Sequence, residues 1–270
     1  MSQRYGLVGH PIEHSISPAM HNAGFKALGI DAHYVLRPTQ KQGVPGLLRE
    51  MQEGVWAGLN VTIPLKTIIA QHIEQDMLAA RAGAVNTLVN QHGSWYGTNT
   101  DIHGILQPLL NMAFIPKHRN ALILGAGGAA RAALIAMEHF GLHCYIAARK
   151  QEAAQNLISH VKPLYGAHAL TLDDARTLTA PIDIVLQATP VGRAGERHSL
   201  AWDKIHSETV AFEMLYKPAT TPFLQDARSA GCVLIPGWKM LLNQGMRAFH
   251  LWTSREAPEA VMEKAITSQL

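Results

Sequence analysis

The chain is 270 residues long, enough to bury a sizeable core and to form two domains. Hydrophobic residues make up 47% of it and charged residues 16%, and the net charge of +3 includes no Lys/Arg run, so we expect no nucleic-acid partner. No apolar stretch approaches the ~20 residues of a membrane span, and the N-terminal residues read as a strand, so we expect neither membrane binding nor a signal peptide.

The first half of the chain alternates strands and helices and then closes with a hairpin. Strand-type and helix-type patterns with Pro and Gly punctuation define each element. The expected elements are a strand at 4–9, a helix at 18–28, a strand at 33–36, a helix at 44–51, a strand at 58–63, a helical stretch from residue 66, and strands at 84–89 and 94–97. This pattern predicts a mixed α/β layer.

The second half repeats strand–helix steps. After a helix at 102–112, short apolar strands are expected at 121–124, 144–147, 182–187, 210–212 and 233–235, followed by helices at 240–251 and near 258–266. Short apolar runs at helix-length intervals are typical of a parallel sheet covered on both faces. The fold class is therefore predicted as α/β with two domains: an N-terminal mixed α/β domain and a Rossmann-type, doubly wound parallel-sheet domain.

A glycine turn lies where the second half begins. The apolar strand at 121–124 runs into Gly125, Ala126, Gly127, Gly128 and Ala129, and a helix follows. Glycines let the backbone approach a pyrophosphate, whose charge the helix N-terminus favours. The pattern predicts a dinucleotide site; the alternative is a tight strand–helix turn with no ligand.

Polar residues gather at strand ends in the first half. Ser15 and Ser17 precede a predicted helix, where their hydroxyls could reach an anion, although Ser17 could simply cap the helix. Asn60 and Thr62 share one strand face, and Lys66 follows a proline-terminated strand. A lone Lys is usually a solvated surface residue, but the polar face beside Lys66 favours a functional role.

Two further strings add an amide and a hydroxyl each. Asn86 lies at one strand terminus, and Asp101 begins a helix after another. The alternative for Asp101 is a helix cap or a favourable N-terminal charge.

The spacing of the His and Cys residues does not fit a metal site. The chain has fifteen His residues but no His-Glu-x-x-His or Cys/His cluster, so we expect no metal site. Cys144 and Cys232 lie in apolar runs typical of reduced core thiols, which favours a cytoplasmic location.

Taken together and in order, these strings resemble the shikimate dehydrogenase family, from Tyr5 to about Trp252. The motifs are Ser-x-Ser-Pro at 15–18, Asn-Val-Thr-x-Pro-x-Lys at 60–66, Gly-Ala-Val-Asn-Thr at 83–87, Asn-Thr-Asp at 99–101 and Gly-Ala-Gly-Gly-Ala-Ala-Arg at 125–131. The resemblance also takes in 214–216, 221–224 and 237–241, with Gln244 beyond.

The resemblance implies an oxidoreductase that reversibly reduces 3-dehydroshikimate to shikimate with NADPH, in chorismate and aromatic amino-acid biosynthesis. Lys66 and Asp101 would be the catalytic pair. Substrate would be bound by Ser15 and Ser17 at its carboxylate, and at or near its ring hydroxyls by Asn60, Thr62, Asn86, Asp101, Tyr216 and Gln244. The cofactor NADP would be bound by Gly125, Ala126, Gly127, Gly128, Ala129, Arg149, Lys150, Thr189, Met214 and Gly237.

The implied domains are a substrate-binding, catalytic domain at 1–102, completed by C-terminal helices at 239–270, and a dinucleotide-binding domain at 103–238. The implied partner is a small-molecule substrate, and the protein would be a monomer or homodimer.

The chain departs from the family pattern on the cofactor side. Where the family commonly shows Asn-Arg-Thr, this chain has Ala148-Arg149-Lys150. Gln187 replaces the Asn of Asn-Ala-Thr, and Lys239 enters the stretch after Gly237. Arg149 and Lys150 suit a 2′-phosphate, and the nearest acid is Glu152 rather than a residue at the end of the second strand, so NADP is expected over NAD. Two alternatives stay open: an NAD-using quinate/shikimate dehydrogenase, and a catalytically silent dinucleotide-binding module.

Overall fold

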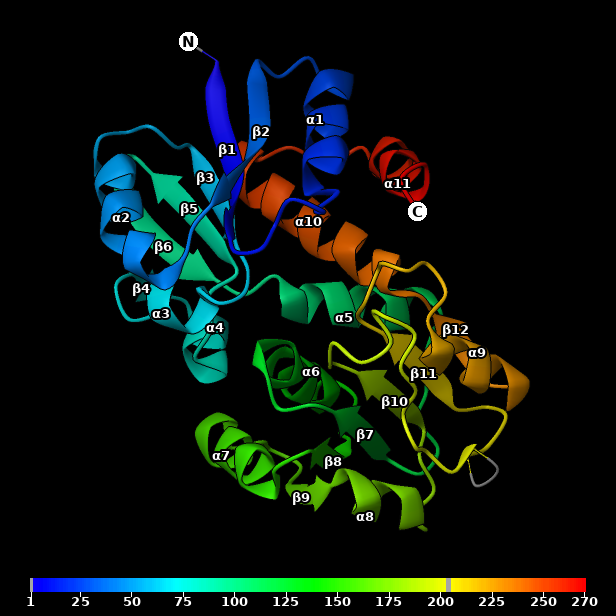
Figure 1. Ribbon diagram of the computed structural model, residues 1–270. Coiled ribbons are helices and arrows are strands. Elements are labelled where there is room, and N and C mark those ends of the chain that lie inside the picture. Colours follow the sequence, from blue (N-terminus) through cyan, green and yellow to red (C-terminus); the bar gives the residue numbers. More distant parts are fainter. Residues whose placement is uncertain (1, 203–204) are drawn as a thin grey trace. The chain divides into compact units, whose positions relative to one another are not determined.

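The computed structural model describes residues 2–202 and 205–270, which form two compact units (Figure 1). Unit 1 comprises the chain up to Gly104 together with Leu242–Gln269, and unit 2 comprises Ile105–Leu241 with Leu270. The division therefore falls inside two helices, α5 (Asp101–Asn111) and α10 (Gly237–Thr253). No helix of the described residues is both long and apolar enough to cross a membrane.

Unit 1 is built on a mixed six-stranded sheet in the order β2-β1-β3-β5-β6-β4. The parallel strand β1 lies between β2 and β3, whereas β5 runs antiparallel to both β3 and β6. The strands are β1 (Gln3–Gly9), β2 (Ala32–Pro38), β3 (Gly58–Val61), β4 (Glu74–Gln75), β5 (Thr87–Gln91) and β6 (Ser94–Thr98). The helices are α1 (Ser17–Ala27), α2 (Val44–Gln52), α3 (Lys66–Ile69), α4 (Met77–Ala82) and α11 (Glu259–Thr267), with a 3-10 turn at Lys41–Gly43.

Alternation along β1 sends its side chains into two different cores. Val8 joins an aliphatic cluster with Leu47 of α2 and Leu59 of β3. Tyr5, on the other face, meets an aromatic group: its ring centroid lies 5.1 Å from that of Phe25 in α1 and 5.0 Å from that of Trp252 in α10. The sheet is thus covered on both faces, which Figure 1 shows as α2 on one side and α1 with α10 on the other.

Two strand boundaries in unit 1 differ from those expected. The strand expected at 84–89 begins only at Thr87, because the N–H groups of Ala84 and Val85 bond instead to the carbonyls of Ala79 and Lys66. The strand expected at 58–63 ends at Val61, where the chain turns toward α3. The short elements β4 and α4 were not anticipated, since two strand residues carry no periodic signal.

Unit 2 contains an entirely parallel six-stranded sheet in the order β12-β11-β10-β7-β8-β9. Its strands are β7 (Asn120–Leu124), β8 (His143–Ala148), β9 (Ala167–Thr171), β10 (Ile184–Gln187), β11 (Val210–Glu213) and β12 (Val233–Ile235). Its helices are α6 (Gly128–Glu138), α7 (Gln151–Val161), α8 (Leu172–Thr177) and α9 (Pro222–Ser229), with the end of α5 and the start of α10. Strand order reverses between β7 and β10, so the doubly wound, Rossmann-type fold expected from the sequence is confirmed.

Small side chains let α6 pack closely on this sheet. Ala130, Ala132, Ala133 and Ala136 of α6 are all fully buried. The opposite face carries an apolar cluster in which Leu122 and Val185 of the sheet meet Phe223 of α9. The edge strand β9 escaped the sequence analysis because its residues are only partly buried and include no apolar run.

Candidate active site

The chemistry in unit 1 centres on an ion pair between Lys66 and Asp101. Lys66 is the first residue of α3 and Asp101 the first of α5, and the Lys66 Nζ meets Asp101 Oδ2. The Lys66 side chain is 18% exposed and that of Asp101 only 7%. Because the pair is largely withdrawn from water, the solvated surface role considered for Lys66 is wrong.

Asp101 keeps its second oxygen for a neighbouring amide. Asn86 Nδ2 donates to Asp101 Oδ1 at 2.7 Å. The backbone N–H of Asp101 is meanwhile accepted by Asn99 Oδ1 at 3.1 Å. Asn99 therefore serves the start of α5, and the carboxylate of Asp101 faces Lys66 and Asn86 rather than capping the helix.

Asn86 is the hub of this polar network. Its Oδ1 accepts from the Thr100 backbone N–H at 2.7 Å and from the Thr87 hydroxyl at 3.0 Å. Its Nδ2 also reaches Thr100 Oγ1 at 3.1 Å. Asn86, Thr87, Thr100 and Asp101 are each no more than 5% exposed. Satisfied buried networks hold their members in a single arrangement, so the amide of Asn86 is fixed before any ligand arrives.

Asn60 extends the network toward β2. The Tyr34 hydroxyl donates to Asn60 Oδ1 at 2.8 Å, and Asn60 Nδ2 donates to Thr87 Oγ1 at 3.1 Å. At the other side, the Thr100 hydroxyl donates to Gln244 Oε1 of α10 at 3.5 Å. Asn60, Asn86, Asp101 and Gln244, four of the predicted substrate ligands, are thereby brought into one connected group with Lys66.

Thr62 and the two serines lie outside that hydrogen-bonded group. The Thr62 backbone N–H bonds to the Val8 carbonyl at 2.9 Å, and its side chain is part-buried. The Ser15 hydroxyl donates to Ser17 Oγ at 3.2 Å and accepts the Ser17 backbone N–H at 3.3 Å. Ile16 occupies the cap position of α1 and Ser17 is the first residue of the helix, so the prediction that Ser17 could serve as a helix cap is wrong.

Unit 2 presents backbone rather than side chains at the glycine turn. Gly125 has φ +113°, and a Cβ there would lie 2.9 Å from the Ala188 carbonyl oxygen, so only glycine fits. A Cβ at Gly127 would meet nothing within 4 Å, which leaves open space over the start of α6. An unobstructed helix N-terminus behind a glycine turn fits a dinucleotide pyrophosphate.

The other predicted cofactor ligands lie at neighbouring strand ends of unit 2. Arg149 and Lys150 follow β8 and are both exposed, with Lys150 at the start of α7. Thr189 follows β10, where its hydroxyl donates to Gln187 Oε1 at 2.7 Å. Met214 follows β11, and Gly237 begins α10, packed against the carbonyl of Leu215 so tightly that a side chain there is excluded. Tyr216, a predicted substrate ligand, also belongs to unit 2.

Some members of the site were missed at the level of single residues. Thr87 and Thr100 lie inside the polar strings that the sequence analysis noted, yet neither was chosen because hydroxyl residues are common in turns. Tyr34 gave no signal, since a buried Tyr in an apolar strand reads as core.

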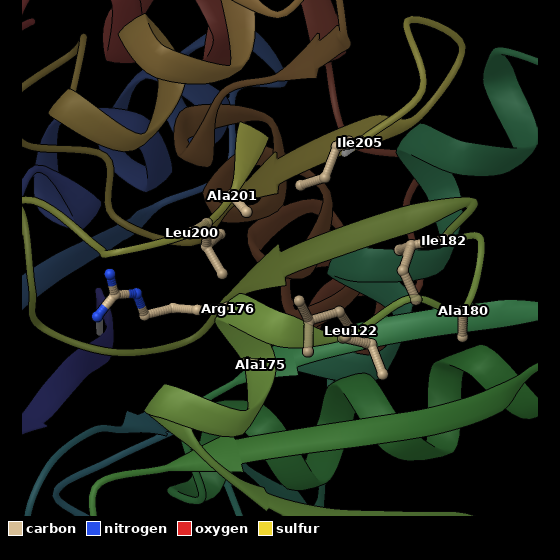
Figure 2. A pocket seen from close by; sticks show the side chains of 9 residues that line it. Leu122, Ala175, Arg176, Ala180, Ile182, Leu200, Ala201 and Ile205 are labelled. Atoms are coloured by element: carbon tan, nitrogen blue, oxygen red, sulfur yellow. The ribbon is translucent and has the colours of Figure 1, made fainter. Parts of the chain in front are cut away.

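Two further features of the described residues carry no site. No group of three or more His, Cys, Asp or Glu residues among them could hold a metal ion. Unit 2 also has a cavity of about 20 Å³ between Leu122, Ile182 and Leu200, from whose apolar side chains Arg176 points away (Figure 2). A space of that size holds about one water molecule, so no substrate fits there.

Known proteins show the same organisation. Residues 7–88 match the family described as "Shikimate dehydrogenase substrate binding domain", and residues 237–267 match "Shikimate 5'-dehydrogenase C-terminal domain". The shikimate dehydrogenase (NADP(+)) of Natronomonas pharaonis is 38% identical over 267 residues, covering 98% of this chain and 99% of that protein.

Solved structures agree over the full length. Shikimate 5-dehydrogenase from Thermus thermophilus, in complex with NADP(H) and shikimate, has a TM-score of 0.88 at 34% identity, covering 99% of this chain and 100% of that one. Quinate dehydrogenase from Corynebacterium glutamicum, in complex with NAD, has a TM-score of 0.89 at 26% identity, covering 99% of both chains. On the strength of these full-length relationships, this chain belongs to the shikimate dehydrogenase family.

Proposed function

We propose that this protein is an NADP-dependent shikimate dehydrogenase, which reversibly reduces 3-dehydroshikimate to shikimate in aromatic amino-acid biosynthesis. The observation that carries this proposal is the Lys66–Asp101 pair, held by Asn86 within a buried polar network. A catalytically silent module has no use for an ammonium and a carboxylate withdrawn from water at this cost.

Carbonyl reduction requires a hydride at carbon and a proton at oxygen. NADPH, when bound, supplies the hydride. The Lys66 ammonium stabilises the developing alkoxide and donates the proton to it, and in the reverse direction the neutral amine takes the proton back. Asp101 orients Lys66 through Oδ2 and leaves Oδ1, already aligned by Asn86, to accept a hydrogen bond from a substrate hydroxyl.

Substrate recognition is assigned to hydroxyl and amide groups. Ser15 and Ser17, whose hydroxyls lie 3.2 Å apart, would bind the carboxylate together. The ring hydroxyls would be bound by Asn60, Thr62, Asn86, Asp101, Tyr216 and Gln244. The fixed amide of Asn86 and the available hydroxyl of Thr62 support these roles, because pre-set partners cost little further ordering on binding.

Cofactor binding is assigned to the glycine turn and its neighbours. Gly125, Ala126, Gly127, Gly128 and Ala129 would bind the pyrophosphate through backbone N–H groups. Arg149 and Lys150 would bind the 2′-phosphate, which favours NADP over NAD. Thr189, Met214 and Gly237 would contact the remainder of the cofactor.

The test is an activity matrix of shikimate and quinate, each with NADP and NAD. We expect shikimate with NADP to give the highest kcat/KM by far. A preference for quinate with NAD would favour the second candidate, an NAD-using quinate/shikimate dehydrogenase, to which the likeness to the Corynebacterium enzyme points. Absence of turnover with all four pairs would favour the remaining alternative, a catalytically silent dinucleotide-binding module.

Location and assembly complete the proposal. Two free, buried thiols at Cys144 and Cys232 support a cytoplasmic setting, where thiols stay reduced. We propose a monomer or homodimer, which sedimentation of the purified protein would test.

A further inference from the structure

A buried carboxylate that the proposed reaction does not use lies at the end of β11. Glu213 is fully buried, and within the described residues it forms no ion pair. Burial raises the pKa of its carboxyl to about 7, even though hydrogen bonds from its neighbours act in the opposite direction. An apolar side chain would avoid this desolvation cost, so the carboxylate calls for an explanation other than stability.

The two oxygens of Glu213 hold the two ends of one loop. Oε1 accepts the backbone N–H groups of Met214 at 2.8 Å and Leu215 at 2.9 Å. Oε2 accepts the hydroxyl of Thr221 at 2.6 Å, and Thr221 in turn caps α9 by accepting the Leu224 N–H at 3.3 Å. One side chain thus closes the segment 214–220, which connects β11 to α9.

The inner end of this loop sets the start of α10. The Leu215 carbonyl packs directly on Gly237, the first residue of that helix. The Met214 N–H has a second acceptor, the Gln187 carbonyl at 3.1 Å, whereas the Leu215 N–H is held by Glu213. Glu213 therefore holds the Met214–Leu215 peptide, whose carbonyl carbon lies 3.0 Å from where a Cβ of Gly237 would stand, next to the peptide that carries the Leu215 carbonyl.

The loop also lies at the binding edge of the sheet. β11 is parallel to β10 with Glu213 paired to Gln187, so the loop leaves the carboxyl ends of the strands, where open α/β sheets bind their ligands. We propose that Glu213 is a positioning residue for NADPH binding: its carboxylate holds Met214, Leu215 and Gly237 in the arrangement that the cofactor needs. This inference rests on the proposed function.

A matched carboxylate exists at the opposite end of the same sheet. Asp183 precedes β10, is 7% exposed, and accepts the backbone N–H groups of Lys117 at 2.7 Å, His118 at 3.0 Å and Asn120 at 3.0 Å. It joins chain segments as Glu213 does, but at the amino ends of the strands. Asp183→Asn therefore reports what a purely structural loss in unit 2 does to the protein.

The test compares Glu213→Ala, Glu213→Gln and Asp183→Asn by NADPH affinity from cofactor fluorescence, thermal stability, and amide hydrogen exchange without cofactor. Glu213→Ala should weaken NADPH by about tenfold or more, the value of one lost hydrogen bond to a charged group, and should speed exchange at Leu215. Glu213→Gln retains an acceptor for Leu215 and should keep affinity within about threefold of the parent. Asp183→Asn should lower the melting temperature while leaving NADPH affinity unchanged.

Two outcomes would overturn the proposal: parental NADPH affinity in Glu213→Ala, or an equal loss in Asp183→Asn. If Glu213→Ala does not fold, Thr221→Val removes the hydroxyl, and with it both the outer hydrogen bond to Glu213 and the cap of α9, whereas Thr221→Ser keeps both. NADPH affinity must then fall in the first and recover in the second, and equal affinities refute the role. A parent protein that binds NADPH but does not turn over shikimate would refute the proposed function alone, because affinity and exchange still test the loop.

Discussion

The two candidate binding regions are built from opposite materials. In unit 1 the region consists of side chains: Lys66 and Asn86 are both hydrogen-bonded to Asp101, and all three are largely buried. In unit 2 the region consists mainly of backbone: the glycine turn at Gly125 and Gly127 leaves open space at the start of α6. The side chains of Arg149 and Lys150 are exposed to solvent. Our proposal thus assigns the reaction to the hydrogen-bonded network around Asp101. It assigns the choice between NADP and NAD to Arg149 and Lys150, two solvent-exposed side chains.

This difference predicts how each region responds to substitution. Members of a shared network are strongly non-additive when removed, because each removal disables the same unit. Exposed charges act more independently and are screened by salt. Substitutions in unit 1 should therefore be severe and coupled, and those near Arg149 milder, additive and dependent on ionic strength.

The largest effect is expected from Lys66→Met. Loss of the ammonium removes proton transfer and charge stabilisation, so kcat should fall by roughly 10²–10⁴-fold, the usual range for general acid–base catalysis. Shikimate affinity should fall much less, because its other partners remain. Lys117→Met is the matched control, since Lys117 pairs with Glu208 on the surface with both side chains more than 60% exposed. Near-normal turnover of Lys66→Met would refute the catalytic assignment.

Asp101→Asn tests the coupling directly. The amide keeps an acceptor for Asn86 Nδ2 but loses the charge that orients Lys66, so both kcat and shikimate affinity should fall. In the double variant with Lys66→Met, the combined loss in kcat should be clearly smaller than the product of the two single losses. Multiplying effects would show two independent groups rather than one network.

A smaller effect is expected at the serines. We propose that Ser17 gives one hydrogen bond to the substrate carboxylate, worth about 1.5–3 kcal/mol, so Ser17→Ala should raise the Kd for shikimate accordingly. Because Ser17 is the first residue of α1 and not its cap, the melting temperature of Ser17→Ala should stay close to that of the parent, whereas Ser15→Ala also removes the acceptor of the Ser17 backbone N–H. Calorimetry with shikimate and then with NADP on Ser15→Ala, Ser17→Ala and the double variant would check this. A loss of stability with intact affinity would assign the serines to structure.

The two cations proposed to bind the 2′-phosphate should give a milder, graded response. Arg149→Ala and Lys150→Ala should each lower the NADP/NAD ratio of kcat/KM, with effects that nearly multiply and that shrink as salt rises. Each exposed contact is expected to contribute about 1 kcal/mol, or roughly fivefold. Measuring the ratio at two ionic strengths distinguishes this from a fold defect. An unchanged NADP/NAD ratio of kcat/KM in the double variant would show that Arg149 and Lys150 do not bind the 2′-phosphate.

The contrast between the units also explains what the sequence could reveal. Patterning predicted the α/β class, most strands and the glycine turn, because apolar runs and glycines report directly on local backbone. It also found the polar strings that carry Asn60, Lys66 and Asp101. It could not reveal Glu213 or the link from Tyr34 to Asn60, since these depend on which residues the tertiary fold brings into contact.

The smallest effect at neutral pH is expected from His21, and it tests how dry unit 1 is. The His21 ring is fully buried on α1 and stacks on Tyr34 with centroids 4.4 Å apart, next to the residue that holds Asn60. Burial lowers the pKa of its imidazole from 6.5 to about 3, because the charged form would lose its hydration. Between those two values the unfolded chain takes up a proton that the folded chain refuses.

Folding stability should therefore fall as the pH drops from about 6.5 toward 3, by up to about 1.4 kcal/mol per pH unit from this one group. His21→Phe keeps an aromatic ring against Tyr34 and cannot titrate, so its unfolding free energy should depend less steeply on pH in that window, with turnover at pH 7 nearly unchanged. Urea melts from pH 4 to 7.5 on the parent, His21→Phe and the exposed-site control His72→Phe would measure this. If the unfolding free energy depends equally on pH in all three proteins, water reaches His21. The polar network around Asn60 is then more hydrated than its burial indicates.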